Sequence, residues 1–307
     1  MALPIFIVGT NRSGTTWLAN ILASHKRIAA IQSNKHHKFY YGVIESFYFS
    51  HVYDRYGDLS VKQNYIEFVE AIGASDYFKM AEVNKSFLYS LYPSDYATIF
   101  KKVMDRFALK KNCDFWIEKS PPHSMLLPLI TTSYPKARII SIKRNIYDVV
   151  KSNLGLKFSY EKSRSENNLY RRKNIKNAIK NYYQFNKAIK NFSIKNNHKI
   201  IFIDYSELIN DYEKVLRRIS SFINLPIDLD LKSQAPKNTS FNKNLSKDFQ
   251  FSGSEKLILG FYNLYYKMMP YYLICFKLII RKKLKKRFTI FKNSKLPNWF
   301  YNFHKEI

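Results

Sequence analysis

Short apolar runs alternate with amphipathic stretches along this chain. Four of the runs consist mainly of apolar residues, which is typical of strands buried on both faces of a parallel sheet: residues 5–8, 115–117, 138–142 and 199–203. A turn and a stretch with helical spacing follow each run. Strands that alternate with helices predict βαβ units with right-handed crossovers. We therefore expect an α/β fold of three layers, in which helices flank a central parallel sheet of four or five strands.

Apolar residues recur at helical spacing between these runs. The spacing predicts helices at about 60–73, 94–112, 123–133, 167–195 and 206–224. Residues 29–58 follow neither period and are rich in His, Tyr and Phe. We expect helical additions at 30–115 and beyond residue 250. The predicted main domain covers residues 1–255, and a helical C-terminal extension over 256–307 packs on it.

The first apolar run leads into a glycine-punctuated turn, and a helix begins near Thr15. A strand, a glycine loop and a helix start together form a phosphate cradle, because backbone N–H groups and the helix dipole converge on an anion. The spacing Gly9-x-x-x-x-Gly14 fits the nucleotide-binding P-loop, but Thr15 stands where that motif has its lysine. The positive charge stands earlier, at Arg12. The stretch therefore predicts a P-loop-like fold, but not an NTPase that contacts the β/γ-phosphates through a lysine.

Further charged residues stand where predicted strands end. Glu118 and Lys119 follow the second run, and Arg144 follows the third. Ligands of open α/β sheets bind at the carboxyl ends of the strands, so these side chains are expected at the ligand-binding edge. Ser152 follows Arg144 by eight residues, on the next predicted helix.

The string Arg-Ser-Gly-Thr-Thr-Trp-Leu at 12–18 resembles the 5′-phosphosulfate loop of sulfotransferases, which use 3′-phosphoadenosine 5′-phosphosulfate (PAPS). Further motifs follow in the family's order over most of residues 4–245. The resemblance implies that the loop wraps the phosphosulfate and that Arg144 and Ser152 clamp the 3′-phosphate. It also implies that Trp17 and Tyr205 approach the adenine. The residues implied to bind PAPS are Asn11, Arg12, Ser13, Gly14, Thr15, Thr16, Trp17, Arg144, Ser152, Tyr205, Ser240 and Lys243.

For catalysis, the resemblance implies a cation beside the transferred sulfuryl group and a general base. Lys119, together with Arg12, would neutralise the charge that builds on the bridging oxygen. The candidates for the base are Glu45, His36, His37 and His123. We name Glu45 and His123 as the catalytic candidates, although either side chain could instead be structural. Glu118 is expected to orient a neighbour rather than to transfer a proton.

The resemblance implies transfer of a sulfuryl group from PAPS to a hydroxyl of a carbohydrate or lipid-linked glycan, with an amine as second choice. The Lys-x-His-Leu-Pro context and the Arg-Lys-Gly segment of animal cytosolic phenol and steroid enzymes are missing, so enzymes that act on carbohydrates, lipids or protein tyrosine are closer. No metal is expected, because Arg12, Lys119, Arg144 and the loop amides supply the counter-charge. Two alternatives stay open: a P-loop kinase or NTPase with an altered loop, and a non-catalytic binding module with the same fold.

Composition limits the partners. The 307 residues carry a formal charge of +28, mostly from lysine in a chain also rich in Asn, Ile, Tyr and Phe. A compositional bias of the source genome explains such lysines as well as an anionic substrate or a membrane does, and no nucleic-acid motif accompanies them. The two cysteines, Cys113 and Cys275, indicate neither a disulfide framework nor a zinc site. They suit the cytoplasm, and with Ile5 already inside a strand we expect no leader.

The C-terminal fifty residues change character. Residues 268–280 are apolar and aromatic but interrupted by proline and lysine, and a spanning helix needs about 20 residues. A basic cluster follows at 281–287. An apolar face beside a basic cluster is typical of a helix that lies on a membrane surface. The alternative is a tail helix that packs on the domain and exposes its basic face to solvent.

Overall fold

The computed structural model describes residues 1–33, 42–160, 168–226 and 251–270. It confirms the parallel sheet: five strands pair in the order β2-β5-β1-β6-β7, and every pairing is parallel. The strands are β1 (Leu3–Gly9), β2 (Ile28–Ala30), β5 (Phe115–Lys119), β6 (Arg138–Lys143) and β7 (Ile200–Asp204). Four of them are the predicted apolar runs. The sheet therefore has the P-loop-like arrangement, with β1 at its centre.

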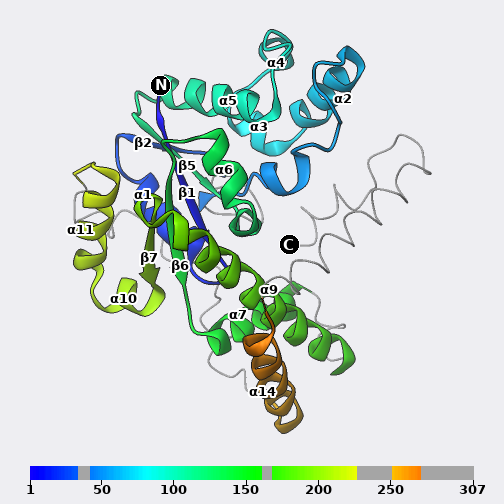
Figure 1. Ribbon diagram of the computed structural model, residues 1–307, viewed down its shortest axis with the longest axis vertical. Helices are drawn as coiled ribbons and strands as arrows, with labels where there is room; N and C mark the ends of the chain where they lie inside the picture. The colour runs from blue at the N-terminus through cyan, green and yellow to red at the C-terminus, as the bar shows by residue number, and fades with distance from the viewer. Residues whose placement is uncertain (34–41, 161–167, 227–250, 271–307) are drawn as a thin grey trace. The chain divides into compact units, whose positions relative to one another are not determined.

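Helices cover both faces of this sheet (Figure 1). On one face, α1 (Thr15–Ala23) and α11 (Tyr212–Ile223) pack against apolar side chains of β1, β5 and β6. On the other face lie α5 (Tyr96–Lys110) and α6 (Leu127–Ser133). Outside them are α2 (Lys62–Gly73), α3 (Asp76–Met80) and α4 (Lys85–Tyr89). The three-layer α/β fold with helical additions is confirmed.

Two of the predicted helices are each divided in the structure. The stretch at 123–133 is a 3₁₀ turn, η2 (Pro121–Met125), followed by α6, because Pro128 fits only the start of a helix. The stretch at 206–224 is α10 (Tyr205–Asn210) and α11, because Asp211 between them has φ −135° and ψ 61°, outside the helical region. The irregular stretch at 29–58 holds β2, a two-stranded antiparallel pair and a π-helical turn. These last elements are β3 (Gln32–Ser33), β4 (Gly42–Val43) and η1 (Tyr48–Val52).

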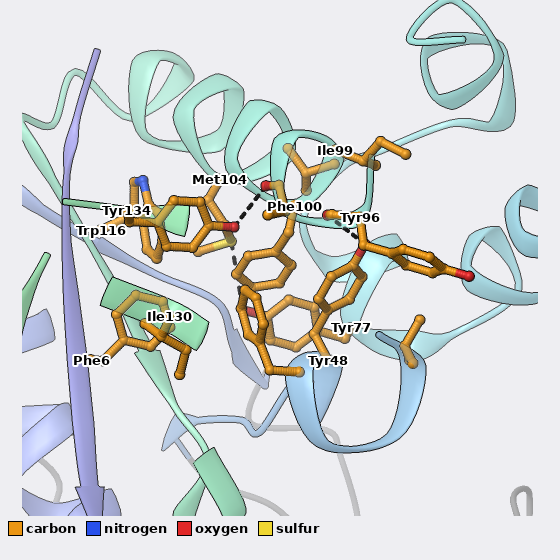
Figure 2. Packing of buried hydrophobic residues seen from close by; sticks show 14 of the residues in the cluster. Phe6, Tyr48, Tyr77, Tyr96, Ile99, Phe100, Met104, Trp116, Ile130 and Tyr134 are labelled. Atoms are coloured by element: carbon orange, nitrogen blue, oxygen red, sulfur yellow. Dashed lines mark hydrogen bonds between the residues drawn. The ribbon is translucent and has the colours of Figure 1, made fainter. Parts of the chain in front are cut away.

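An aromatic cluster fixes η1 against the sheet and α5 (Figure 2). The Tyr48 ring stacks on Phe100, with centroids 4.6 Å apart, and its hydroxyl donates to the Tyr96 carbonyl at 2.8 Å. Burial raises the pKa of Tyr48 and of Tyr134 well above the usual value, so these phenols stay neutral donors. The cluster thereby holds the chain that precedes η1 in one place.

Contacts divide the chain into two compact units, residues 1–145 with 189–239 and residues 146–188 with 240–307. The second unit contains α7 (Ile146–Tyr160), most of α9 (Asn168–Lys195) and α14 (Gly253–Met268). These three helices share one apolar core. No helix within the described ranges is long and apolar enough to cross a bilayer.

Candidate active site

The loop after β1 is shaped by two glycines. A Cβ on Gly9 would lie 2.3 Å from the carbonyl oxygen of Ile142, and one on Gly14 would lie 2.5 Å from the Tyr205 ring. Gly14 also has φ 102°, which side-chain-bearing residues rarely adopt. Between them, the Ser13 amide and hydroxyl both donate to the Thr10 carbonyl, at 3.1 and 2.7 Å. The loop is therefore a tight turn that brings its backbone close to whatever it binds.

Helix α1 begins at the end of this loop. Its N-terminus has no side-chain cap, and its first turn has no acidic residue. The first N–H groups of a helix have no partner inside the helix and carry the positive end of its dipole. The Thr10 hydroxyl is buried and has no hydrogen-bond partner among the described residues. These observations fit a bound phosphate-type anion, whose oxygens would supply the missing acceptors.

The predicted adenine and phosphate residues of the first unit come together beside the loop. The Arg144 guanidinium lies 4.2 Å from the Tyr205 ring centroid and donates from Nη1 to the Arg12 carbonyl at 3.3 Å. The Trp17 and Tyr205 rings meet edge to face, with centroids 5.8 Å apart. Residues from the loop after β1, the first turn of α1, the end of β6 and the start of α10 thus meet at the carboxyl edge of the sheet, as expected for a ligand site.

Two of the predicted catalytic residues, Lys119 and Glu45, form an ion pair. The Lys119 Nζ donates to Glu45 Oε1 at 2.8 Å, with 3% of the Lys119 side chain and 24% of the Glu45 side chain exposed. Lys119 ends β5 and pairs with Ile7 of β1, two residues before Gly9. The pair therefore lies at the same sheet edge as the glycine loop. The side-chain oxygen Glu45 Oε2 carries no hydrogen bond from another described residue.

Behind the ion pair, Glu118 is the centre of a buried hydrogen-bond network. Its Oε1 accepts from the hydroxyls of Ser46 (2.7 Å) and Ser120 (2.6 Å), and its Oε2 accepts from His123 Nδ1 at 2.7 Å. Burial alone would raise the pKa of Glu118, but His123 and the two hydroxyls outweigh burial, so its pKa is lower than usual. Glu118 is thus a carboxylate that holds its neighbours in place.

His123 has no exposed surface, and both of its ring nitrogens are occupied. Nδ1 donates to Glu118, and Nε2 accepts from the Phe49 amide at 3.2 Å. The Ser120 hydroxyl likewise accepts from the Phe47 amide at 3.1 Å. Residues 45–49 are therefore attached to residues 118–123 by side-chain contacts at four positions, and both ring nitrogens of His123 take part in this buried network.

Other predicted residues lie elsewhere or outside the description. Ser152 is buried on α7, in the second unit. Ser240, Lys243 and the pair at 36–37 lie outside the described residues. No group of three or more His, Cys, Asp or Glu residues suited to a metal ion occurs in the described ranges.

Ser124 is a site residue that the sequence analysis missed. Its hydroxyl donates to the Gly9 carbonyl at 3.2 Å and accepts from the Gly9 amide at 3.1 Å. It thus attaches η2 to the start of the glycine loop. A serine in a short turn carries no signal of this contact, which spans 115 residues of sequence.

Known proteins resemble this chain in sequence profile and in fold. The sequence profile of the sulfotransferase family matches residues 4–229. The sulfotransferase domain of the Synechococcus PCC 7002 olefin synthase is similar in fold, with a TM-score of 0.54 at 16% identity over 88% of this chain and 96% of that one. The sulfotransferase of Alicyclobacillus acidocaldarius has a TM-score of 0.48 at 16% identity, over 87% and 93% of the two chains. Mouse sulfotransferase SULT7A1, in complex with PAP, has a TM-score of 0.48 at 12% identity, over 91% and 89%. A comparison with curated protein sequences found no match.

The profile match covers well over half of the chain, and the site has the loop and strand-end residues described above. The chain belongs to the sulfotransferase family, whose members catalyse sulfuryl transfer.

Proposed function

We propose that this enzyme transfers a sulfuryl group from PAPS to a hydroxyl of a carbohydrate or lipid-linked glycan and releases adenosine 3′,5′-bisphosphate (PAP). The observation that carries the proposal is the Glu45–Lys119 pair, at the sheet edge where the glycine loop begins. A carboxylate base beside a nearly buried lysine provides both a proton acceptor and a donor for a leaving oxygen. The missing Lys-x-His-Leu-Pro and Arg-Lys-Gly segments support the group that acts on carbohydrates, lipids or protein tyrosine.

The donor fits the residues present. The loop amides and the N-terminus of α1 would hold the phosphosulfate, with Arg12 as counter-charge. Trp17 and Tyr205 would hold the adenine, and Arg144 the 3′-phosphate, a role for which the family resemblance also names Ser152. Bound PAPS supplies an activated sulfuryl group whose phosphate oxygen is the leaving atom.

The chain's own residues then perform two tasks. Glu45 accepts the hydroxyl proton of the acceptor, through the oxygen that Lys119 does not occupy. Lys119 donates a hydrogen bond to the leaving oxygen as its negative charge grows. The hydrogen bonds of residues 118–123 fix the positions of Glu45 and Lys119. This matters for the rate, since misplacement of a catalytic group by 1 Å can cost about 100-fold.

The first test is the choice of nucleotide. Calorimetric titration should show tight binding of PAP in the presence of EDTA and much weaker binding of ATP with Mg²⁺. A preference for ATP with Mg²⁺ would favour a P-loop kinase or NTPase. Binding of neither nucleotide would favour a non-catalytic module.

The second test concerns the base. PAP release from PAPS is measured over a panel of sugars, glycolipids and tyrosyl peptides, and the responding acceptor is then used with Glu45→Gln. We expect turnover to fall at least about 100-fold while the affinity for PAP stays within about twofold. Glu67→Gln, which changes an exposed carboxylate on α2, is the matched control. Unchanged turnover in Glu45→Gln would remove Glu45 from the mechanism.

The cysteine content supports a cytoplasmic location. Fractionation of cells that express the full chain tests the location directly.

A further inference from the structure

One side of α14 carries a row of exposed apolar side chains. Their spacing of four, three, one and three residues places them along one face of a helix. The members of this α14 stripe are Leu257, Phe261, Leu264, Tyr265 and Met268. Their exposed fractions run from 42% for Tyr265 to 77% for Leu257. Single exposed apolar residues are ordinary, but a contiguous row marks an interaction surface.

Side-chain contacts at both ends of α14 fix which face is exposed. Near its N-terminus, Glu255 accepts two hydrogen bonds from Arg171 of α9, at 2.6 and 3.0 Å. Near its C-terminus, Lys187 of α9 donates to the Tyr266 carbonyl at 2.9 Å. Leu259 and Tyr266, on the face opposite the stripe, are buried in the shared core. Because both ends are held, α14 cannot rotate to bury the stripe against α7 or α9.

The charge around the stripe is positive. The described residues of the second unit include 10 lysines and arginines but only 2 aspartates and glutamates. The one acidic residue of α14, Glu255, is buried and paired with Arg171. Lys256 and Lys267 are exposed, and helical geometry places both along one border of the stripe. The surface therefore combines apolar side chains with an uncompensated positive field.

We propose that the α14 stripe docks on an anionic lipid surface. A helix with an apolar face and bordering lysines lies in the headgroup region, with the apolar side chains inserted and the lysines at the phosphates. A second copy of the chain fits less well, since it would bring together two units of the same high positive charge. The sequence after α14 continues the pattern, with apolar residues at 271–280 and a basic cluster at 281–287. The proposal does not depend on the donor site, whose loop lies in the first unit.

The test is flotation of the full chain with vesicles. We expect binding to vesicles of phosphatidylcholine with phosphatidylglycerol to be at least tenfold tighter than to phosphatidylcholine alone, and to weaken as salt is raised. The triple substitution Leu257→Ser, Phe261→Ser and Leu264→Ser should weaken the binding at least tenfold. The matched control places serine at three exposed apolar positions outside α14: Val61→Ser, Leu109→Ser and Ile194→Ser.

Three results would overturn the proposal. Equal losses in the two triple variants would mean that general hydrophobicity, and not the stripe, drives binding. If the α14 variant binds vesicles as tightly as the native protein, the basic residues alone account for the binding. If neither vesicle binds and the α14 variant lowers the melting temperature or dissociates a dimer, then protein covers the stripe. PAP titration of the same samples shows separately whether the donor site is intact. The double variant Lys256→Glu with Lys267→Glu tests whether the positive charge beside the stripe contributes to vesicle binding, because it leaves the apolar side chains of the stripe unchanged.

Discussion

Replacing Glu118 with glutamine would change the buried network without changing its shape. In the native protein, the carboxylate accepts from Ser46, Ser120 and His123. If the new amide nitrogen faces His123, two donors meet, and a change of tautomer only moves the conflict to the Phe49 amide. If the nitrogen faces the serines, the fully buried Ser120 hydroxyl loses its acceptor. Each unmade buried hydrogen bond costs about 1–3 kcal/mol, so we expect a loss of about 2–4 kcal/mol in the free energy of unfolding.

Equilibrium unfolding in denaturant at pH 7 measures this loss. The matched control is Glu82→Gln, because Glu82 is paired with Lys110 and Lys111 at the surface, where ion pairs contribute little. We expect the control to unfold at nearly the native midpoint. If Glu118→Gln and the control unfold at the same denaturant midpoint, the hydrogen-bond network of Glu118 is not what holds residues 45–49 in place.

The pH dependence provides an independent check on the same carboxylate. The pKa of Glu118 is lower in the folded protein than its usual 4.5, so ionised Glu118 stabilises the fold fully above about that pH. The stabilisation disappears as the pH falls through the lowered folded value. The stability difference between the native protein and Glu118→Gln should therefore be constant from pH 7 to about 5 and shrink below it. A difference that grows on acidification would contradict the assignment.

Two further substitutions, and the turnover of Glu118→Gln, test the site. Gly14→Ala should weaken PAP binding at least about tenfold in calorimetry, because its Cβ would lie 2.5 Å from the Tyr205 ring; Gly155→Ala, which has open space around it, is the control, and equal affinities would contradict a tight loop. Arg144→Ala should weaken PAP strongly but leave adenosine 5′-phosphosulfate nearly unaffected, whereas equal losses would remove the 3′-phosphate role. Glu118→Gln should lower turnover at least about tenfold with PAP affinity within about twofold, and a loss of PAP binding instead would place the network on the donor side.

The sequence predicts the fold class and four of the five strands of the parallel sheet, but not the strand β2. Four strands stand out because each consists mainly of apolar residues, while β2 is only three residues long and sits in a stretch without period. Helix α5 agrees with its prediction to within two residues, and Asp95 caps it by accepting from the Thr98 amide. The caps Ser75 and Asn84, which accept from the amides of Phe78 and Phe87, could have revealed α3 and α4.

The candidate site also has a part that the sequence predicts and a part that it does not. Local motifs pointed to the glycine loop, Lys119 and Arg144, because each follows an apolar run directly. The partner of Lys119 could not be read locally, since Glu45 is 74 residues away in a stretch with no periodic signal. The occupied nitrogens of His123 also depend on a backbone amide 74 residues distant. Tertiary contacts alone decide which polar side chains stay available for chemistry.

The contacts of residues 118–124 bear on any redesign of acceptor preference. This short stretch holds Gly9 through Ser124 on one side and residues 45–49 through Glu118, Ser120 and His123 on the other. A library of variants randomised over residues 118–124 would disturb both the glycine loop that is proposed to bind the donor and the position of Glu45. Most of its members would lose donor binding and the proposed base together. Exposed positions between Asp54 and Ser60 lie outside these hydrogen bonds, so changes there would leave the contacts of Gly9 and of residues 45–49 intact.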